Sequence, residues 1–151
     1  MSLFRWSGLA LTATLLLGCS SDGVVGPSGH FDHAAATFSC GPADGPAFTI
    51  YLAPDPITSL QPAGVFVRVY VPGTIAENSG TTLPISSHSN AGAWFHANPT
   101  DYEIATGGFL RIDSGSEGST IEGEVDLRFP NAGHLHGAFR ADWIPTHVGC
   151  V

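Results

Sequence analysis

The fold is decided between residues 121 and 143, where the chain reads IEGEVDLRFPNAGHLHGAFRADW. Mostly apolar residues alternate with charged residues or histidines on both sides of a turn-forming segment, Pro130-Asn131-Ala132-Gly133. An alternation with a period of two predicts β-strands with one buried and one exposed face. Proline and glycine between the two runs predict a tight reversal. We therefore expect an antiparallel hairpin.

The register of this hairpin decides which polar side chains face each other on its exposed side. We expect His136 to lie opposite either Asp126 or Arg128, depending on register. A strict four-residue turn would place apolar residues opposite polar ones, so a β-bulge is expected near Gly133. Opposite charges facing each other across strands stabilise a sheet by roughly 0.2–1 kcal/mol for each pair.

The same alternation recurs along most of the chain, bounded by glycine, proline, asparagine and serine. It is clear in residues 48–52, 65–71 and 109–113, and weaker in residues 35–40, 82–86 and 92–96. No window shows the 3.6-residue apolar repeat of a long helix. Together these segments predict an all-β fold, an antiparallel β-sandwich of about seven or eight strands, with a small β-barrel as the alternative.

The first eighteen residues have the organisation of a secretory signal peptide. Arg5 precedes an apolar run that extends over residues 6–17, and the small residue Gly18 stands just before Cys19. This order of a cation, an apolar segment and a small residue is typical of a cleaved signal peptide. The run is shorter than the roughly 20 residues that a membrane-spanning helix needs.

The sequence Leu16-Leu17-Gly18-Cys19 resembles the lipobox of bacterial lipoproteins. The resemblance implies cleavage before Cys19, attachment of lipid to its sulfur, and anchoring in the lipid bilayer. Ser20, rather than aspartate, follows the cysteine, which implies the outer membrane of a diderm bacterium. The mature domain is similar to uncharacterised β-sandwich envelope lipoproteins without matching a specific family.

Three segments follow from these patterns. Residues 1–18 are predicted to be the lipoprotein signal peptide. Residues 19–36 contain the lipidated Cys19 and a stretch rich in glycine, serine and proline, which predicts a flexible tether. Residues 37–151 are long enough for one hydrophobic core and are predicted to form a single β-sandwich domain.

Two further cysteines, Cys40 and Cys150, stand near the two ends of the predicted domain. An even pair in an exported protein predicts a disulfide. The chain-entropy model assigns roughly 4–5 kcal/mol to closing a loop of about 110 residues. A reactive or metal-binding thiol is the alternative, but neither cysteine lies in a CxxC motif or beside a histidine.

The chain is acidic and contains no lysine. Thirteen acidic residues and five basic ones give a formal net charge of −8 at pH 7. A surface without a basic patch argues against binding of nucleic acid and against docking on anionic lipid.

Seven histidines are the chain's only excess of a reactive residue type. His134 and His136 are two positions apart on a predicted strand, so they point to the same face. With Asp126 as the nearest third ligand, they form a candidate Zn or Cu site. His88 or His96 would add a ligand only if their strand lay alongside. The alternative is that both imidazoles are solvated partners of Asp126 across the hairpin.

Motifs of common enzyme classes are absent from the sequence. There is no GxSxG, no HExxH, no P-loop and no dinucleotide-binding fingerprint, so we assign no catalytic residue and expect no cofactor. The sequence favours a non-catalytic binding or structural module of the cell envelope, with an envelope protein or a small ligand as its partner. The alternative is a metal-binding protein or metal-dependent enzyme built on His134 and His136.

Overall fold

The computed structural model describes residues 23–26, 28–42, 45–60 and 62–146. Among these residues no helix is both long and apolar enough to cross a membrane. The elements, in chain order, are β1 (Val24–Gly26), β2 (Gly29–Phe31), β3 (His33–Cys40), β4 (Pro46–Ala53), β5 (Phe66–Pro72), α1 (Ile75–Asn78), β6 (Thr82–Pro84), β7 (Gly92–Asn98), β8 (Asp101–Ile104), β9 (Gly107–Ser114), β10 (Ile121–Phe129) and β11 (Gly133–Trp143).

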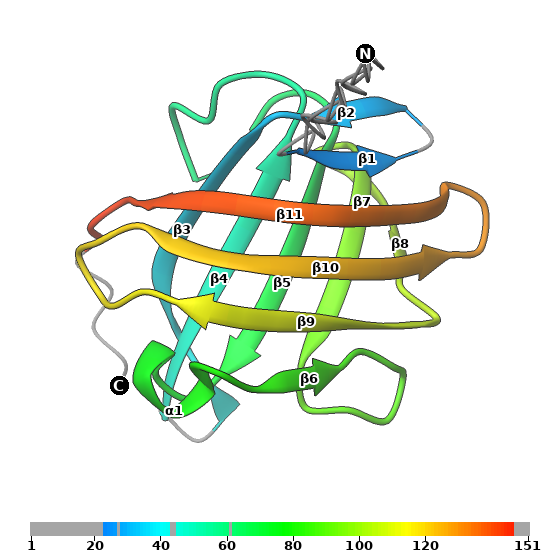
Figure 1. Ribbon diagram of the computed structural model, residues 1–151. Coiled ribbons are helices and arrows are strands. Elements are labelled where there is room, and N and C mark those ends of the chain that lie inside the picture. The colour runs from blue at the N-terminus through cyan, green and yellow to red at the C-terminus, as the bar shows by residue number, and fades with distance from the viewer. Residues whose placement is uncertain (1–22, 27, 43–44, 61, 147–151) are drawn as a thin grey trace, which may run out of the picture.

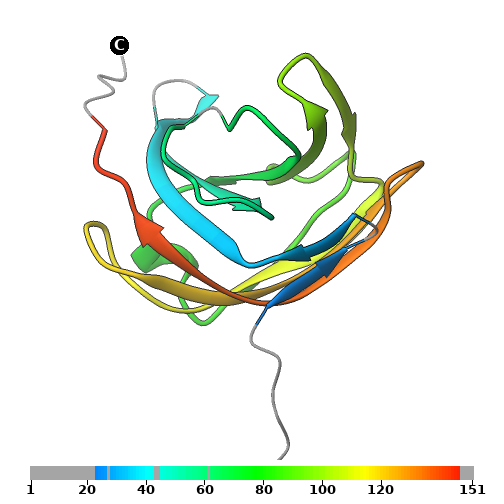
Figure 2. The ribbon, with the colours of Figure 1, turned by 90° about the horizontal axis from the view of Figure 1, so that it is seen from above.

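The strands form two layers of one curled sheet. The front layer contains β6, β9, β10 and β11, with β1 and β2 beyond β11, and the back layer contains β3, β4, β5, β7 and β8. In Figure 1 the strands of the front layer cross those of the back layer obliquely. β11 joins the layers, because its C-terminal end pairs in parallel with β3 while every other named strand pair is antiparallel. Figure 2 shows how the sheet curls around the space between the layers.

The predicted all-β class is confirmed, with more strands than expected. Each of the eight segments predicted from alternation contains a strand, and β1, β2 and β8 are additional, giving eleven in the described part of the chain. The path of paired strands has β6 at one end and β8 at the other. The architecture is therefore a sandwich whose layers are joined at one edge, and it resembles half of a barrel.

The β10–β11 hairpin forms as predicted but without the expected bulge. Phe129 pairs with Gly133, which leaves a turn of three residues, and Asp126 pairs with His136 in an unbroken register. Gly133 has φ of +83°, a left-handed conformation that glycine adopts without steric cost. The prediction of a bulge was wrong because Gly133 belongs to the strand rather than to the turn. The register shift of β10 lies on its other edge, against β9.

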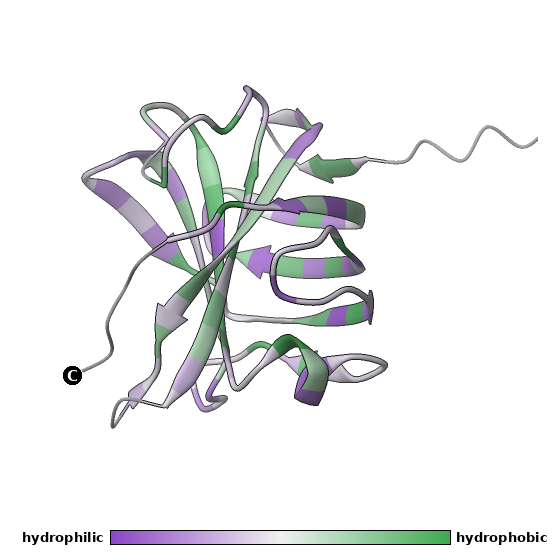
Figure 3. Ribbon diagram, turned by 90° about the vertical axis from the view of Figure 1, so that its left-hand side faces the viewer, coloured by the Kyte–Doolittle hydropathy of each residue, from purple (hydrophilic) through white to green (hydrophobic). Residues whose placement is uncertain are grey.

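Apolar side chains of both layers pack into a single core. Along β10 and β11 buried and exposed residues alternate almost without exception, and Figure 3 shows the corresponding change of hydropathy from residue to residue. Leu127 and Leu135 face each other across the hairpin and are 0% exposed, as are Ile50 and Val69 of the back layer. One cluster contains them all, so burial of apolar surface holds the layers together.

The prediction of a flexible tether from 19 to 36 was wrong for its described residues, because β1, β2 and the first part of β3 lie within it. Val24 and Phe31 are 0% and 2% exposed, so apolar burial fixes this segment to the sheet. β1 pairs with β11 at a point of close approach. A Cβ on Gly137, whose φ is +142°, would lie 2.4 Å from the carbonyl oxygen of Gly23. The described domain thus begins before residue 37.

Several predicted features lie outside the described residues. They are the signal peptide over residues 1–18, the lipidation site Cys19 and the second disulfide cysteine Cys150. Lipidation at Cys19 and pairing of Cys40 with Cys150 therefore stay predictions.

Candidate binding site

The outer face of the front layer pairs its charges internally. Arg111 Nη1 lies 2.9 Å from Glu124 on the neighbouring strand, and its Nε lies 2.7 Å from Asp113. Arg140 Nη1 lies 3.0 Å from Glu122. These pairs follow from the strand register, which sets Glu124 opposite Arg111 and Glu122 opposite Arg140. Because each of these arginines already has a carboxylate, neither is left unpaired for an anionic ligand.

The predicted metal ligands also lie on this face, and the structure brings them together. His134 Nε2 lies 3.1 Å from Asp126 Oδ2, and the rings of His134 and His136 stack with centroids 4.8 Å apart. A tetrahedral metal site requires that the lone pairs of its ligands converge on one point. Stacked imidazole rings do not direct their lone pairs in this way. Within the described residues no group of three His, Cys, Asp or Glu side chains is arranged to hold a metal ion. His88 lies on a loop and His96 lies on β7 of the back layer, so neither residue is on a strand that pairs with β10 or β11.

The outer face of the back layer is aromatic rather than charged. The register places Tyr51, Arg68 and Trp94 in one row across β4, β5 and β7. A second row runs through Phe66, His96 and Tyr102 on β5, β7 and β8. With Tyr70, these residues make up what we call the aromatic face: Tyr51, Phe66, Arg68, Tyr70, Trp94, His96 and Tyr102.

His96 is the buried titratable side chain of the described residues. It is 7% exposed, and its ring stacks on that of Phe66 at a centroid distance of 4.2 Å and an interplanar angle of 8°. Neither ring nitrogen has a hydrogen-bond partner of good geometry among the described residues. Burial lowers the pKa of His96 and the charge of Arg68 lowers it further, whereas a poorly aligned backbone hydrogen bond with Asn98 raises it. The imidazole is therefore neutral at pH 7, with one donor and one acceptor nitrogen.

Arg68 is held in place by stacking rather than by an acid. Its guanidinium carbon lies 4.7 Å from the centre of the Trp94 ring, a cation–π contact. The Nε atom is buried without a hydrogen-bond partner. Of the arginines in the described part of the chain, Arg68 forms no ion pair, whereas Arg111, Arg128 and Arg140 each do.

All buried side-chain polar atoms without a partner, within the described residues, belong to the aromatic face. They are Arg68 Nε, Tyr70 Oη and both ring nitrogens of His96. Burial raises the pKa of Tyr70, and it also raises that of Tyr51 against the opposing charge of Arg68. Buried polar groups are nearly always hydrogen-bonded, and each exception calls for an explanation. The unpartnered buried atoms all lie on one face, which indicates that another molecule supplies their hydrogen-bond partners there.

A cleft opens at two of these three residues. We call it the His96 cleft; it has a volume of about 290 Å³ and is lined by Tyr51, Leu60, Phe66, Arg68, His96 and Pro99. The strands β4, β5 and β7 form its floor, and Leu60 and Pro99 come from the loops after β4 and β7. Four aromatic or apolar residues line it beside the polar groups of Arg68 and His96, and its accessible lining is more polar than apolar. Convergent polar groups among aromatic residues are typical of sites for small ligands.

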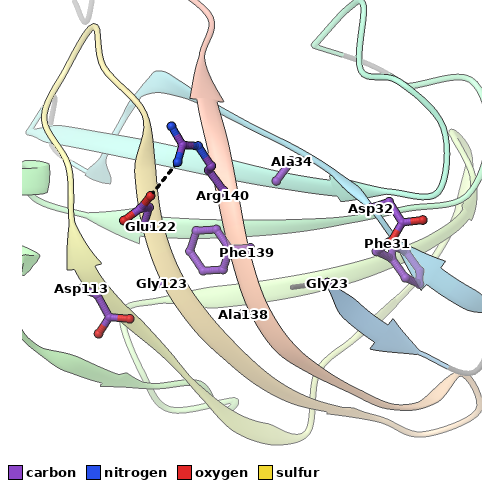
Figure 4. A pocket seen from close by; sticks show the side chains of 10 residues that line it. All are labelled: Gly23, Phe31, Asp32, Ala34, Asp113, Glu122, Gly123, Ala138, Phe139 and Arg140. Carbon is purple, nitrogen blue, oxygen red and sulfur yellow. Dashed lines mark hydrogen bonds and ion pairs between the residues drawn. The ribbon is translucent and has the colours of Figure 1, made fainter. Parts of the chain in front are cut away.

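A larger hollow of about 400 Å³ lies where β10 and β11 approach β2 and β3, and Figure 4 shows the side chains that line it. Three of its charged groups already have partners: Arg140 is joined to Glu122 by the ion pair drawn there, and Asp113 is paired with Arg111. None of the unpartnered buried atoms of the described residues lies in it. Size alone therefore does not make it the better candidate.

A third cleft, of about 390 Å³, lies between β8 and the β10–β11 turn. There the Glu103 carboxylate accepts hydrogen bonds from the backbone N–H groups of Asn131 and Ala132 and from the side chain of Asn131. This carboxylate clamps the turn of the front layer to the edge strand of the back layer. Its role is structural, because its hydrogen bonds go to the protein itself.

The sequence did not single out Arg68, and it named His96 only as a conditional ligand of the predicted metal site. A signal was present, because Phe66, Arg68 and Tyr70 occupy the polar positions of an alternating strand whose opposite face is valine. Aromatic residues at polar positions indicate a face that is shielded from solvent. The pairing of β5 with β7, and hence the meeting of Arg68 with His96, is a tertiary property.

Comparison with known proteins gives no further indication. No family model, no curated protein and no solved structure matches this chain.

Proposed function

We propose that this protein is a lipid-anchored envelope module that binds a small organic molecule, without catalysis, in the His96 cleft. The unpartnered imidazole of His96 carries the proposal. A histidine that is 7% exposed and has no well-aligned hydrogen bond among the described residues is costly to the folded protein. A ligand that hydrogen-bonds to the ring removes this cost.

The anchor rests on the resemblance of Leu16-Leu17-Gly18-Cys19 to a lipobox. β1 begins at Val24, five residues after Cys19. Five extended residues span at most about 18 Å. An anchor at Cys19 would thus hold the sheet close to the membrane surface, in the outer membrane of a diderm bacterium.

The anchor is tested with Cys19→Ser in the full chain. We expect the variant to accumulate as an unprocessed precursor or to leave the membrane fraction. If it still partitions with detergent-extracted membranes as the wild type does, the lipobox assignment is wrong.

A disulfide between Cys40 and Cys150 is part of the same proposal. With Cys19 assigned to lipid, Cys40 and Cys150 are the two remaining cysteines of the three in the chain. The C-terminal segment runs beside β3 up to Thr146, whose hydroxyl bonds to the carbonyl of Phe38. Cys150 follows four residues later. Mass spectrometry of the non-reduced protein is expected to find the Cys40–Cys150 peptide pair, and two free thiols would contradict it.

The binding site is tested with phenol, a neutral flat ring of a size that fits the cleft. Titration of the full chain in detergent, followed through the imidazole signals in nitrogen–proton NMR spectra, is expected to shift the resonances of His96. Those of His134 and His136 on the front layer are expected to stay in place. Leu60→Trp fills the His96 cleft and is expected to abolish the shift.

A matched control is Ala97→Trp, which places the same side chain in the cleft beside β8. It is expected to leave the response of His96 to phenol unchanged. Equal shifts of all the histidines, or a response of His96 that survives Leu60→Trp, would overturn the assignment of the site.

A further inference from the structure

We propose that the ligand of the His96 cleft is a hydroxylated ring carboxylate, bound by Arg68 through its carboxylate and by His96 through a hydroxyl. The inference rests on the proposed function and adds the chemical class of the ligand. It follows from three features of the cleft, which are a fixed unpaired guanidinium, a neutral imidazole and apolar walls.

The guanidinium is oriented for a carboxylate. Stacking of Arg68 on Trp94, at 4.7 Å, covers one face of the guanidinium plane. The N–H groups of a guanidinium lie in its plane, so stacking leaves them directed sideways, and the Nε–H is unpartnered. Two parallel N–H groups match the two oxygens of a carboxylate.

The charge balance of the site selects a monoanion. Arg68 is the single cation among the lining residues of the cleft, and burial keeps His96 neutral by lowering its pKa. The whole chain has a formal net charge of −8, which repels multivalent anions. One negative charge on the ligand is balanced at Arg68, while a second would remain uncompensated in a partly dry site.

The remaining groups define the body of the ligand. Tyr51, Leu60, Phe66 and Pro99 present apolar surface, and a volume of about 290 Å³ holds a single ring with its substituents. Neutral His96 has one donor and one acceptor nitrogen, which is the complement of a hydroxyl group. An aromatic hydroxy acid and a uronic acid both carry this chemistry.

The experiment compares pairs of ligands in which one member carries a carboxylate and the other carries a neutral group at the same position. The probes are 4-hydroxybenzoate against phenol, and galacturonate against galactose, titrated into the full chain in detergent by calorimetry and by NMR of His96. We expect at least one carboxylate to bind about tenfold or more tightly than its neutral counterpart. Binding by the aromatic acid alone identifies an aromatic ligand, and binding by the uronate alone identifies an acidic sugar.

Arg68→Met keeps the length of the side chain and removes the charge. It is expected to abolish the preference for the carboxylate over its neutral counterpart. Arg111→Met, on the front layer, is the matched control and is expected to retain the wild-type preference. Circular dichroism confirms that both variants keep their strand content.

The outcomes separate the inference from the proposed function. If phenol shifts His96 but neither carboxylate binds more tightly than its neutral counterpart, the ligand class is wrong and the binding site stands. If the preference for the carboxylate survives Arg68→Met, the role of Arg68 is wrong. If no probe moves His96, both the ligand class and the proposed function are overturned.

Discussion

The polar groups on the two outer faces of the sandwich differ in whether they have partners within the protein. On the front layer, the guanidinium groups of Arg111 and Arg140 lie within 3.0 Å of carboxylates set opposite them by the strand register. On the back layer, Arg68 stacks on an aromatic ring and forms no ion pair among the described residues. His96 beside it is buried with both ring nitrogens unpartnered. Both faces belong to one fold and enclose one core.

The difference separates stability from binding. A polar group that is satisfied within the protein stabilises the fold a little, since an exposed ion pair contributes about 0–1 kcal/mol. A buried polar group without a partner costs the fold about 1–3 kcal/mol until something binds it. We infer that the front layer presents a solvated surface. The buried polar groups of the back layer destabilise the free protein, and a ligand that hydrogen-bonds to them would restore the lost stability.

The largest expected effect tests whether the two layers share one core. Leu127→Ala on the front layer and Ile50→Ala on the back layer each remove a side chain that is 0% exposed. Each is expected to lower the free energy of unfolding by about 2–5 kcal/mol, because a cavity is left behind. Urea unfolding followed by fluorescence and circular dichroism measures it, and a single transition is expected.

The control is Ile104→Ala, which shortens an apolar side chain that is 53% exposed. Its effect is expected to stay within about 0.5 kcal/mol. Two separate transitions in either core variant would show that the layers unfold independently. The two faces would then belong to two separate folding units rather than to one core.

A second prediction concerns the clamp between the layers. Glu103→Ala removes the acceptor for the N–H groups of Asn131 and Ala132. We expect the free energy of unfolding to fall by about 2 kcal/mol, as for hydrogen bonds to a charged group. Hydrogen exchange at the Ala132 amide is expected to accelerate. Asp101→Ala, an exposed acid on the same strand, is the control, and an equal loss there would contradict the role of the clamp.

A third prediction uses His96 itself. His96→Phe replaces a buried unpartnered imidazole by an apolar ring, so we expect the free energy of unfolding to rise by about 1 kcal/mol in the absence of ligand. His134→Phe on the front layer breaks the contact with Asp126 and is expected to give no gain. A loss of stability in His96→Phe would show that the imidazole already has a partner in the free protein.

The gain from His96→Phe is also expected to depend on pH. Burial lowers the pKa of His96 in the folded protein below its ordinary value of 6.5. The unfolded chain therefore binds the proton more readily, and the wild type loses stability as the pH falls through about 6.5 toward the lowered folded value. Above this window the imidazole is neutral in both the folded and the unfolded state, so the wild type loses no stability to protonation of His96. The advantage of the variant should thus be larger at pH 5.5 than at pH 8.

The smallest expected effect compares the arginines of the two faces. Arg111→Met removes contacts with Asp113 and Glu124, so we expect a slightly lower urea midpoint in dilute buffer and a smaller decrease at 1 M salt. Arg68→Met removes no ion pair and is expected to show a weaker dependence on salt. An equal salt dependence in both variants would mean that Arg68 has a carboxylate partner.

Local alternation determined much of this protein. Residues 121–143 predicted a hairpin, and eight segments predicted strands, because a half-buried strand must alternate apolar and polar residues. The strands β1 and β2 were missed, since the glycines and proline around Val24 and Phe31 suggested a tether. Their burial depends on β11, where Gly137 lets β1 approach closely.

The candidate site was decided only by the tertiary structure. The sequence drew attention to His134 and His136 because they stand two positions apart, which is a local pattern. Arg68 and His96 are 28 positions apart in sequence and meet because β5 pairs with β7. Whether a polar side chain has a hydrogen-bond partner depends on which strands lie beside it. The order of strands in a sheet cannot be predicted from any single segment of the chain.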